Sequence, residues 1–174
     1  MQAVILALVL ALATPSFSPA ITERPARARV DAVTQQLGIV VGRLEIPAID
    51  LDEVMREGVD LSVIDRGVAH WSGTADPGGA GNIVLAGHRT IHSAPFLDLD
   101  KLEPGDEIYV TGIGGRIATY RVVETLIVTP ADMWIVDPTD TPMLTMFACH
   151  PKGSARQRIV VRAELVDAPV VQFP

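Results

Sequence analysis

Short runs of β-branched and aromatic residues, separated by glycine, proline and aspartate, fill the chain from Gly38 onward. Val, Ile, Thr and Tyr favour pleated strands, whereas Gly, Pro and Asp favour turns. Many short runs at this spacing indicate strands rather than helices, so the sequence predicts an all-β domain, either a mostly antiparallel barrel or a sandwich. The predicted strands cover residues 38–46, 58–64, 82–87, 106–112, 116–128, 142–149 and 158–165.

Three segments between or before these strands carry other signals. The glycines of IGGR at 113–116 lie between two strand-like runs and predict a hairpin turn, because the helix that follows a phosphate-binding loop is missing. Residues 94–102 are the best helical candidate, since Pro95 suits a first turn and Phe96, Leu99 and Leu102 recur every third residue. Residues 30–37 are expected to add one short helix.

The N-terminal segment predicts export from the cytoplasm. Its first twenty residues carry no charged side chain, and residues 3–13 form an unbroken apolar run with A-L-A at its end. The run has the length of a signal-peptide core and is short for a membrane span, so a signal is favoured over an anchor. We expect an apolar segment and linker at 1–37, one folded domain at 38–166 and a tail at 167–174, with the domain outside the cytoplasm at the membrane or cell surface.

Charge and cysteine content exclude several classes of function. The chain has 14 basic and 21 acidic residues and a net charge of -7, without a basic stripe, so no nucleic-acid partner is expected. His88 and His92 have the spacing of the zinc-protease helix, but Arg89 stands where that motif has glutamate, so no metal and no cofactor are expected. The single cysteine excludes an internal disulfide and leaves either a buried structural thiol or a reactive one.

Cys149 lies in surroundings that suit a reactive thiol. A thiol nucleophile needs partial exposure, nearby positive charge and a base within hydrogen-bond reach. Cys149 ends the strand-like run PMLTMFAC and is followed by Lys152, Arg156 and Arg158, while His88 follows another strand-like run, NIVLAG. If a sheet pairs these two strands, the thiol and the imidazole will meet at one edge, where rigid scaffold and solvent access coincide.

Three stretches together resemble the sortase family, and in particular its actinobacterial class E group. They read GRLEIPAIDLDEVMREGVDL, HWSGTADPGGAGNIVLAGHRT and FACHPKGSARQRIVVRAEL, and the likeness runs from about Gly42 to Leu165. The resemblance implies a closed β-barrel of about eight strands with short helices. By position in these motifs it also implies three catalytic residues, His88, Cys149 and Arg158.

The resemblance also implies a reaction and its partners. In sortases a cysteine thiolate attacks the Thr-Gly bond of a C-terminal sorting signal of LPxTG or LAxTG type, and an amine resolves the thioacyl enzyme. The expected partners are therefore the sorting-signal peptide of a secreted protein and an amine of a peptidoglycan precursor or a pilin. His88 would act as general acid and base, and Arg158 would bind the oxyanion or hold the peptide.

Three further residues are expected at the substrate groove. Sortases of this group usually read T-L-T-T-C up to the nucleophile. This chain keeps the first threonine as Thr145 but has Ala148 in place of the threonine beside the cysteine, so its substrate preference is expected to differ. His70 opens the second stretch and is expected as a groove or packing residue. Two alternatives stay open: a thiol peptidase that passes the acyl group to water, and an inactive surface barrel that only binds peptide.

Overall fold

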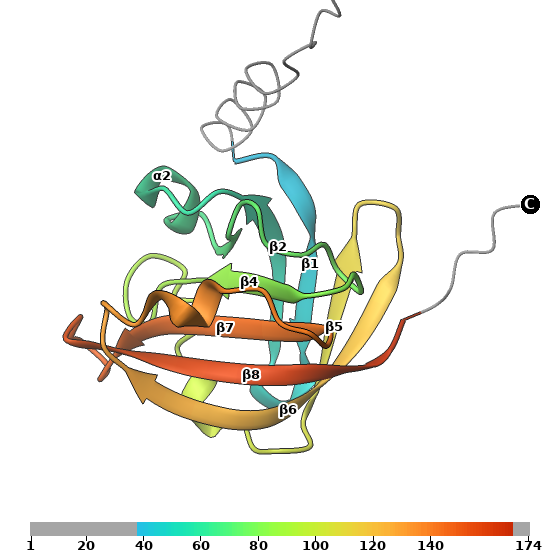
Figure 1. Cartoon of the computed structure of the whole chain (residues 1–174). Coiled ribbons are helices and arrows are strands. Elements are labelled where there is room, and N and C mark those ends of the chain that lie inside the picture. The colour runs from blue at the N-terminus through green and yellow to red at the C-terminus, as the bar shows by residue number, and fades with distance from the viewer. Residues whose placement is uncertain (1–37, 169–174) are drawn as a thin grey trace, which may run out of the picture.

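The computed structural model describes residues 38–168, which form a closed barrel with short helical turns (Figure 1). This confirms the all-β domain that the strand pattern predicted and the closed barrel that the resemblance implied. The strands are β1 (Val40–Ile46), β2 (Leu51–Glu57), β3 (Val68–His70), β4 (Asn82–Ala86), β5 (Glu107–Gly112), β6 (Ile117–Val128), β7 (Met143–His150) and β8 (Gln157–Asp167). The helical elements are η1 (Pro47–Ile49), α2 (Leu61–Ile64), η2 (Leu99–Lys101) and η3 (Met133–Val136).

The order of strands around the barrel brings the middle and the end of the chain together. It runs β1-β2-β3-β4-β7-β8-β6-β5, and β5 closes onto β1. Most neighbours are antiparallel, while β2 pairs with β3, and β4 with β7, in parallel. Strands β4, β7 and β8 therefore lie side by side (Figure 1), although β4 precedes the other two by more than fifty residues.

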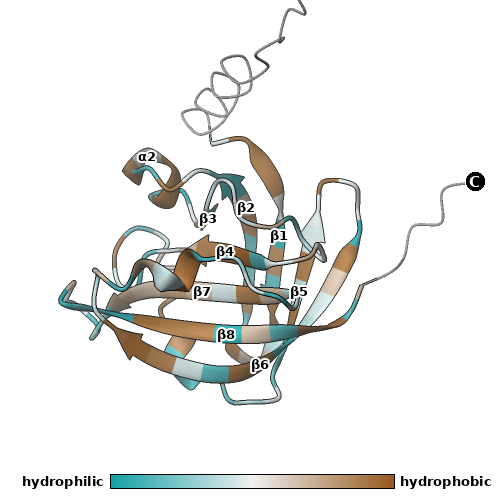
Figure 2. Cartoon of the chain, in the orientation of Figure 1, coloured by the Kyte–Doolittle hydropathy of each residue, from teal (hydrophilic) through white to brown (hydrophobic). Residues whose placement is uncertain are grey.

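The barrel interior is filled by one face of each strand. Along β7, Leu144, Met146 and Ala148 belong to the main buried cluster, which also takes residues from every other strand of the described barrel. Because strand side chains alternate, Thr145, Phe147 and Cys149 face outward. Figure 2 shows hydrophobic residues predominating on β4, β7 and β8. The outward face of β7 thus carries the candidate nucleophile on a strand whose other face packs in the core.

The strand predictions were right for six runs, wrong for one and missed two strands. Residues 58–64 form the short helix α2, because the N–H groups of Val63 and Ile64 both donate to the carbonyl of Asp60. Val63 is the buried residue of α2, so the segment lacks the alternating apolar face that a strand needs. Strands β2 and β3 were missed, since LDEVMRE is rich in charge and VAH is very short.

The predicted helix at 94–102 was also wrong. The segment is a series of turns that ends in the 3-10 helix η2 (Leu99–Lys101). Phe96, Leu99 and Leu102 are all buried, and their three-residue spacing fits the three residues per turn of a 3-10 helix better than the 3.6 of an α-helix. Ala94 has a φ of 45°, which is incompatible with a continuous α-helix.

The hairpin predicted at 113–116 is confirmed. Gly115 adopts a φ of 74°, and the N–H of Gly112 donates to the carbonyl of Arg116 across the turn between β5 and β6. The apolar run at 3–13, the expected helix at 30–37 and the end of the tail lie outside the described residues. Within 38–168, no helix has the length and apolar character to cross a bilayer.

Candidate active site

Cys149 and Arg158 occupy facing positions on two neighbouring strands. They are Cα partners in the antiparallel pair of β7 and β8, so their side chains lie on the same, outward face of the barrel. Cys149 is partly exposed. Nη1 of Arg158 donates to the carbonyls of Ala155 and Gln157, both at 2.9 Å, which fixes the guanidinium against the loop between the strands.

His88 reaches the same edge from β4. Strands β4 and β7 run parallel, with Ala86 opposite Phe147, and the N–H of Gly87 donates to the Phe147 carbonyl at 3.3 Å. His88 follows two residues after this last pair, and Cys149 lies two residues beyond Phe147, so the chain leaving β4 carries His88 toward the edge at which β7 presents Cys149. The structure thus brings the three predicted residues, which are far apart in the sequence, to one edge of three adjacent strands.

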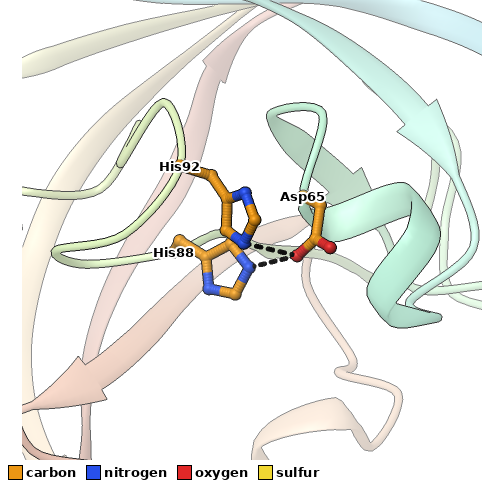
Figure 3. A group of neighbouring side chains, drawn as sticks. All are labelled: Asp65, His88 and His92. Atoms are coloured by element: carbon orange, nitrogen blue, oxygen red, sulfur yellow. Dashed lines mark hydrogen bonds and ion pairs between the residues drawn. The ribbon is translucent and has the colours of Figure 1, made fainter.

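Asp65 orients the candidate histidine. Its Oδ1 lies 2.8 Å from Nε2 of His88, and the His88 side chain is only 13% exposed (Figure 3). Since Nε2 is engaged with this carboxylate, Nδ1 is the ring nitrogen left to exchange protons with a substrate. The sequence did not predict Asp65, because it follows α2 in LSVIDRG, a segment without a recognisable motif.

The loop that carries His88 is anchored by a buried guanidinium. The Arg89 side chain is 1% exposed, and its Nε donates to the carbonyl of Leu97 at 2.8 Å. Its Nη2 lies 2.8 Å from Oδ1 of Asp100, close enough for an ion pair, although the angle is not that of a hydrogen bond. Burial favours a higher pKa for Asp100, but the charges of Arg89 and Lys152 outweigh it and lower that pKa.

Lys152 ties the loop after Cys149 to the loop after His88. Its Nζ lies 3.2 Å from Oδ1 of Asp98 and 3.4 Å from Oδ1 of Asp100. Hydrogen bonds from Lys101 and then from Lys152 lower the pKa of Asp98. The two segments that flank the candidate site are therefore cross-linked by ion pairs, which limits their separation.

The expected groove residues Thr145 and Ala148 are both buried. Thr145 faces outward from β7, but it is fully covered, and its hydroxyl donates to Oδ1 of Asn82 at 2.8 Å. Nδ2 of Asn82 in turn donates to the carbonyls of Ile135 and Asp137, so this network holds the η3 segment against the barrel. Ala148 points into the core. These contacts are structural, and direct contact with a peptide is not supported by the burial of either side chain.

His70 lies away from the Cys149 edge, at the opposite mouth of the barrel. It helps to line a cavity of about 270 Å³ together with residues of the β5–β6 hairpin. Its Nδ1 lies 2.6 Å from Oε2 of Glu57, and its Nε2 lies 3.1 Å from Oγ1 of Thr74. The imidazole is 8% exposed, so the structure gives it a packing role and does not bring it to the other candidate residues.

Fold and site together define a class: a closed β-barrel with a thiol, an imidazole and a guanidinium at one edge. Residues 44–166 match the family model described as the Sortase domain. The chain therefore belongs to the Sortase family.

Individual relatives agree with this assignment. The chain is 34% identical over 140 residues to sortase SrtE1 of Streptomyces coelicolor, covering 71% of this chain and 40% of that protein. It is 31% identical over 135 residues to sortase D of Bacillus subtilis, covering 75% of this chain and 66% of that protein. The chain thus spans less than two thirds of the length of either relative.

Solved structures of sortases share the fold. Sortase E of Streptomyces avermitilis superposes with a TM-score of 0.69 at 29% identity, covering 76% of this chain and 91% of that one. Sortase E1 of Streptomyces coelicolor, solved with a tripeptide in its active site, gives a TM-score of 0.69 at 29% identity over 75% of this chain and 90% of that one. The Clostridium perfringens sortase D5 transpeptidase gives 0.68 at 29% identity over 80% and 89%.

Proposed function

We propose that this chain is a cysteine transpeptidase that cleaves a C-terminal sorting signal of LPxTG or LAxTG type between Thr and Gly. Family membership supports the reaction type. The observation that carries the proposal is the shared edge, where Cys149 faces Arg158 across two paired strands and His88 follows the end of β4, the strand beside β7. Three neighbouring strand ends at one edge suit an extended peptide whose scissile carbonyl must meet all three groups.

The reaction begins from the thiolate of Cys149 and the imidazolium of His88. Sγ attacks the threonine carbonyl carbon, and the guanidinium of Arg158 stabilises the oxyanion that forms. When the carbon–nitrogen bond breaks, His88 gives its proton to the departing glycine amine, and a thioacyl enzyme remains. His88 then takes a proton from the incoming amine, which forms the new amide bond as the carbon–sulfur bond breaks.

Arg158 can hold the oxyanion without losing its present contacts. A guanidinium carries five N–H donors and keeps its charge at any physiological pH. Within residues 38–168, the hydrogen bonds of Arg158 use Nη1, so donors on Nε and Nη2 remain for a ligand. The two bonds to the loop carbonyls hold the guanidinium in place before substrate arrives. A donor that is already in position can stabilise the oxyanion without first having to move.

The acceptor in this proposal is an amine of a peptidoglycan precursor or a pilin lysine, and the domain acts outside the cytoplasm at the membrane or cell surface. Residues 1–37 would supply the export signal or anchor, residues 38–166 the catalytic domain and 167–174 a tail. The tripeptide in the active site of the Streptomyces coelicolor relative supports a peptide ligand for the corresponding edge of this barrel.

The test incubates the purified full chain with fluorogenic LPxTG and LAxTG peptides, with and without a glycine or diaminopimelate-like amine, and identifies the products by mass. A new amide between the threonine carboxyl and the added amine is expected. Release of the free acid alone, at every amine concentration, would favour a thiol peptidase. Absence of cleavage and of thiol labelling by a reactive peptide analogue would favour an inactive binding barrel.

A further inference from the structure

The side chains of Asp65, His88 and His92 converge from two loops on one point (Figure 3). Oδ1 of Asp65 lies 2.8 Å from Nε2 of His88 and 3.2 Å from Nε2 of His92. One ligand atom from each of the three residues lies within 4.8 Å of the other two. Each imidazole therefore directs its Nε2 toward Oδ1 of Asp65.

A turn of the loop after β4 places His92 on His88. His92 adopts a φ of 53°, and its ring stacks on that of His88 with centroids 4.9 Å apart and an interplanar angle of 25°. The left-handed backbone costs about 1–2 kcal/mol for a residue other than glycine, so other contacts of the loop must hold it. The burial of Arg89 and Phe96 in the same loop supplies such contacts.

The sequence argued against a metal because the spacing of His88 and His92 lacks the glutamate of a zinc-protease helix. The fold changes that argument, since the third ligand comes from a different element, the segment that follows α2. Two imidazoles and one carboxylate form a common three-ligand set for zinc with one open position. Magnesium and calcium prefer oxygen ligands and fit this set poorly.

We propose that Asp65, His88 and His92 form a binding site for one divalent transition cation of the zinc class. In a tetrahedral zinc site with bonds of about 2.0–2.1 Å, ligand atoms stand about 3.3–3.4 Å apart. The carboxylate oxygen and the two ring nitrogens already stand 2.8 and 3.2 Å apart, so the cation needs only small side-chain shifts to enter. The exposure of His92, at 45%, leaves a path from solvent.

Such a cation would switch off the reaction proposed above, and this part of the inference rests on that proposed function. A catalytic imidazolium must carry a proton on each ring nitrogen before it protonates the leaving amine. An imidazole bound to a metal through Nε2 cannot carry a proton there. His88 therefore cannot bind the cation and protonate the leaving amine at the same time, and zinc acts as a reversible inhibitor.

Binding is measured on the full chain carrying Cys149→Ala, because a free thiolate is itself a zinc ligand. Calorimetric titration with zinc, and cobalt absorption as a coordination signal, should give one equivalent. Adding His92→Phe, which keeps a stacking ring, should weaken binding by about a hundredfold or more, because even outer-shell partners of metal ligands are worth about 10–100-fold. Asp60→Asn removes an exposed carboxylate near the same helix and should leave binding unchanged.

Absence of a bound equivalent, or equal zinc affinity in the His92→Phe protein, would overturn the site. A second experiment uses the wild type and His92→Phe, both with Cys149 intact. Peptide cleavage is measured with zinc and then after a chelator is added, and each rate is expressed relative to the same protein's rate without metal. Zinc should inhibit the wild type more strongly than His92→Phe, and chelation should restore the rate. Equal inhibition of the two proteins would assign the effect to the thiol and contradict the proposal. If zinc binds but no variant cleaves peptide, the site stands and the proposed reaction fails.

Discussion

Cys149 and Arg158 face each other directly across the antiparallel pair of β7 and β8. Because side chains on a strand alternate, a slip of one residue in this register would turn one of the two into the barrel core. The interior positions of the same strands, such as Met146 and Val161, are fully buried and fix the register. The packing of the core therefore determines the distance between the thiol and the guanidinium.

We expect Arg158→Ala to reduce kcat/KM by about a hundredfold or more, the usual cost of removing one oxyanion donor. Arg158→Lys should be nearly as impaired, because a lysine has no planar fork with which to keep the loop carbonyls and bind the oxyanion together. Arg156→Ala, which removes an exposed arginine from the loop just before β8, is the matched control. Near-normal turnover of Arg158→Ala in the peptide assay would remove the guanidinium from the mechanism.

Asp65→Asn should lower kcat about tenfold or more with little change in KM, because the carboxylate orients His88 without touching the peptide. The amide keeps the size of the side chain, so the fold should remain intact by circular dichroism. Asp60→Asn, at the opposite end of the same short helix, serves as the control. A change confined to KM would indicate that Asp65 shapes the groove and does not position His88.

Asp100→Asn should destabilise the domain by about 1–3 kcal/mol in urea unfolding, because it leaves the buried guanidinium of Arg89 without its counter-ion. The effect should stay below that of a fully buried pair, since the Asp100 side chain is 44% exposed. Asp98→Asn, which removes a carboxylate paired with surface lysines, should cost clearly less. Equal losses in the two variants would contradict the anchoring role of Arg89.

The buried pair of Glu57 and His70 predicts acid sensitivity. Burial is the largest single influence and favours a higher pKa for Glu57, but the hydrogen bond from His70, the interaction with Ser72 and the charge of His70 together outweigh it and lower that pKa below its ordinary value of 4.5. The carboxylate therefore stabilises the fold above pH 4.5, and this stabilisation is lost as the pH falls through the lowered pKa. Glu57→Gln should be less stable than wild type at pH 7, and the gap should close in acid. Glu103→Gln, at an exposed position, should show no such trend.

Gly42 allows β1 to approach β5. A Cβ at this position would lie 2.2 Å from the carbonyl oxygen of Thr111 and 2.6 Å from the end of Met55, so Gly42→Ala must push the two strands apart. We expect a lower thermal midpoint, with a loss of about 1–3 kcal/mol typical of overpacking. Gly114→Ala, where a Cβ would meet nothing within 4 Å, should be close to neutral. Equal midpoints for the two variants would contradict this close packing.

Strands with an apolar inward face, such as β4 and β7, could be predicted because their runs of apolar residues indicate burial of one or both faces. The charged β2 could not, since its pairing with β1 depends on residues elsewhere in the chain. The motifs around His88, Cys149 and Arg158 identified the candidate site by resemblance. Asp65 and the burial of Thr145 could not be predicted, because both depend on how distant segments pack together.

The most direct test of the proposed mechanism is intact-mass spectrometry of the full chain mixed with an LPxTG or LAxTG peptide in the absence of an added amine. The mechanism predicts a mass increase equal to the peptide up to its threonine, located on Cys149 and lost when an amine is added. Cleavage of the peptide without any such adduct, or an adduct that persists in Cys149→Ala, would contradict it.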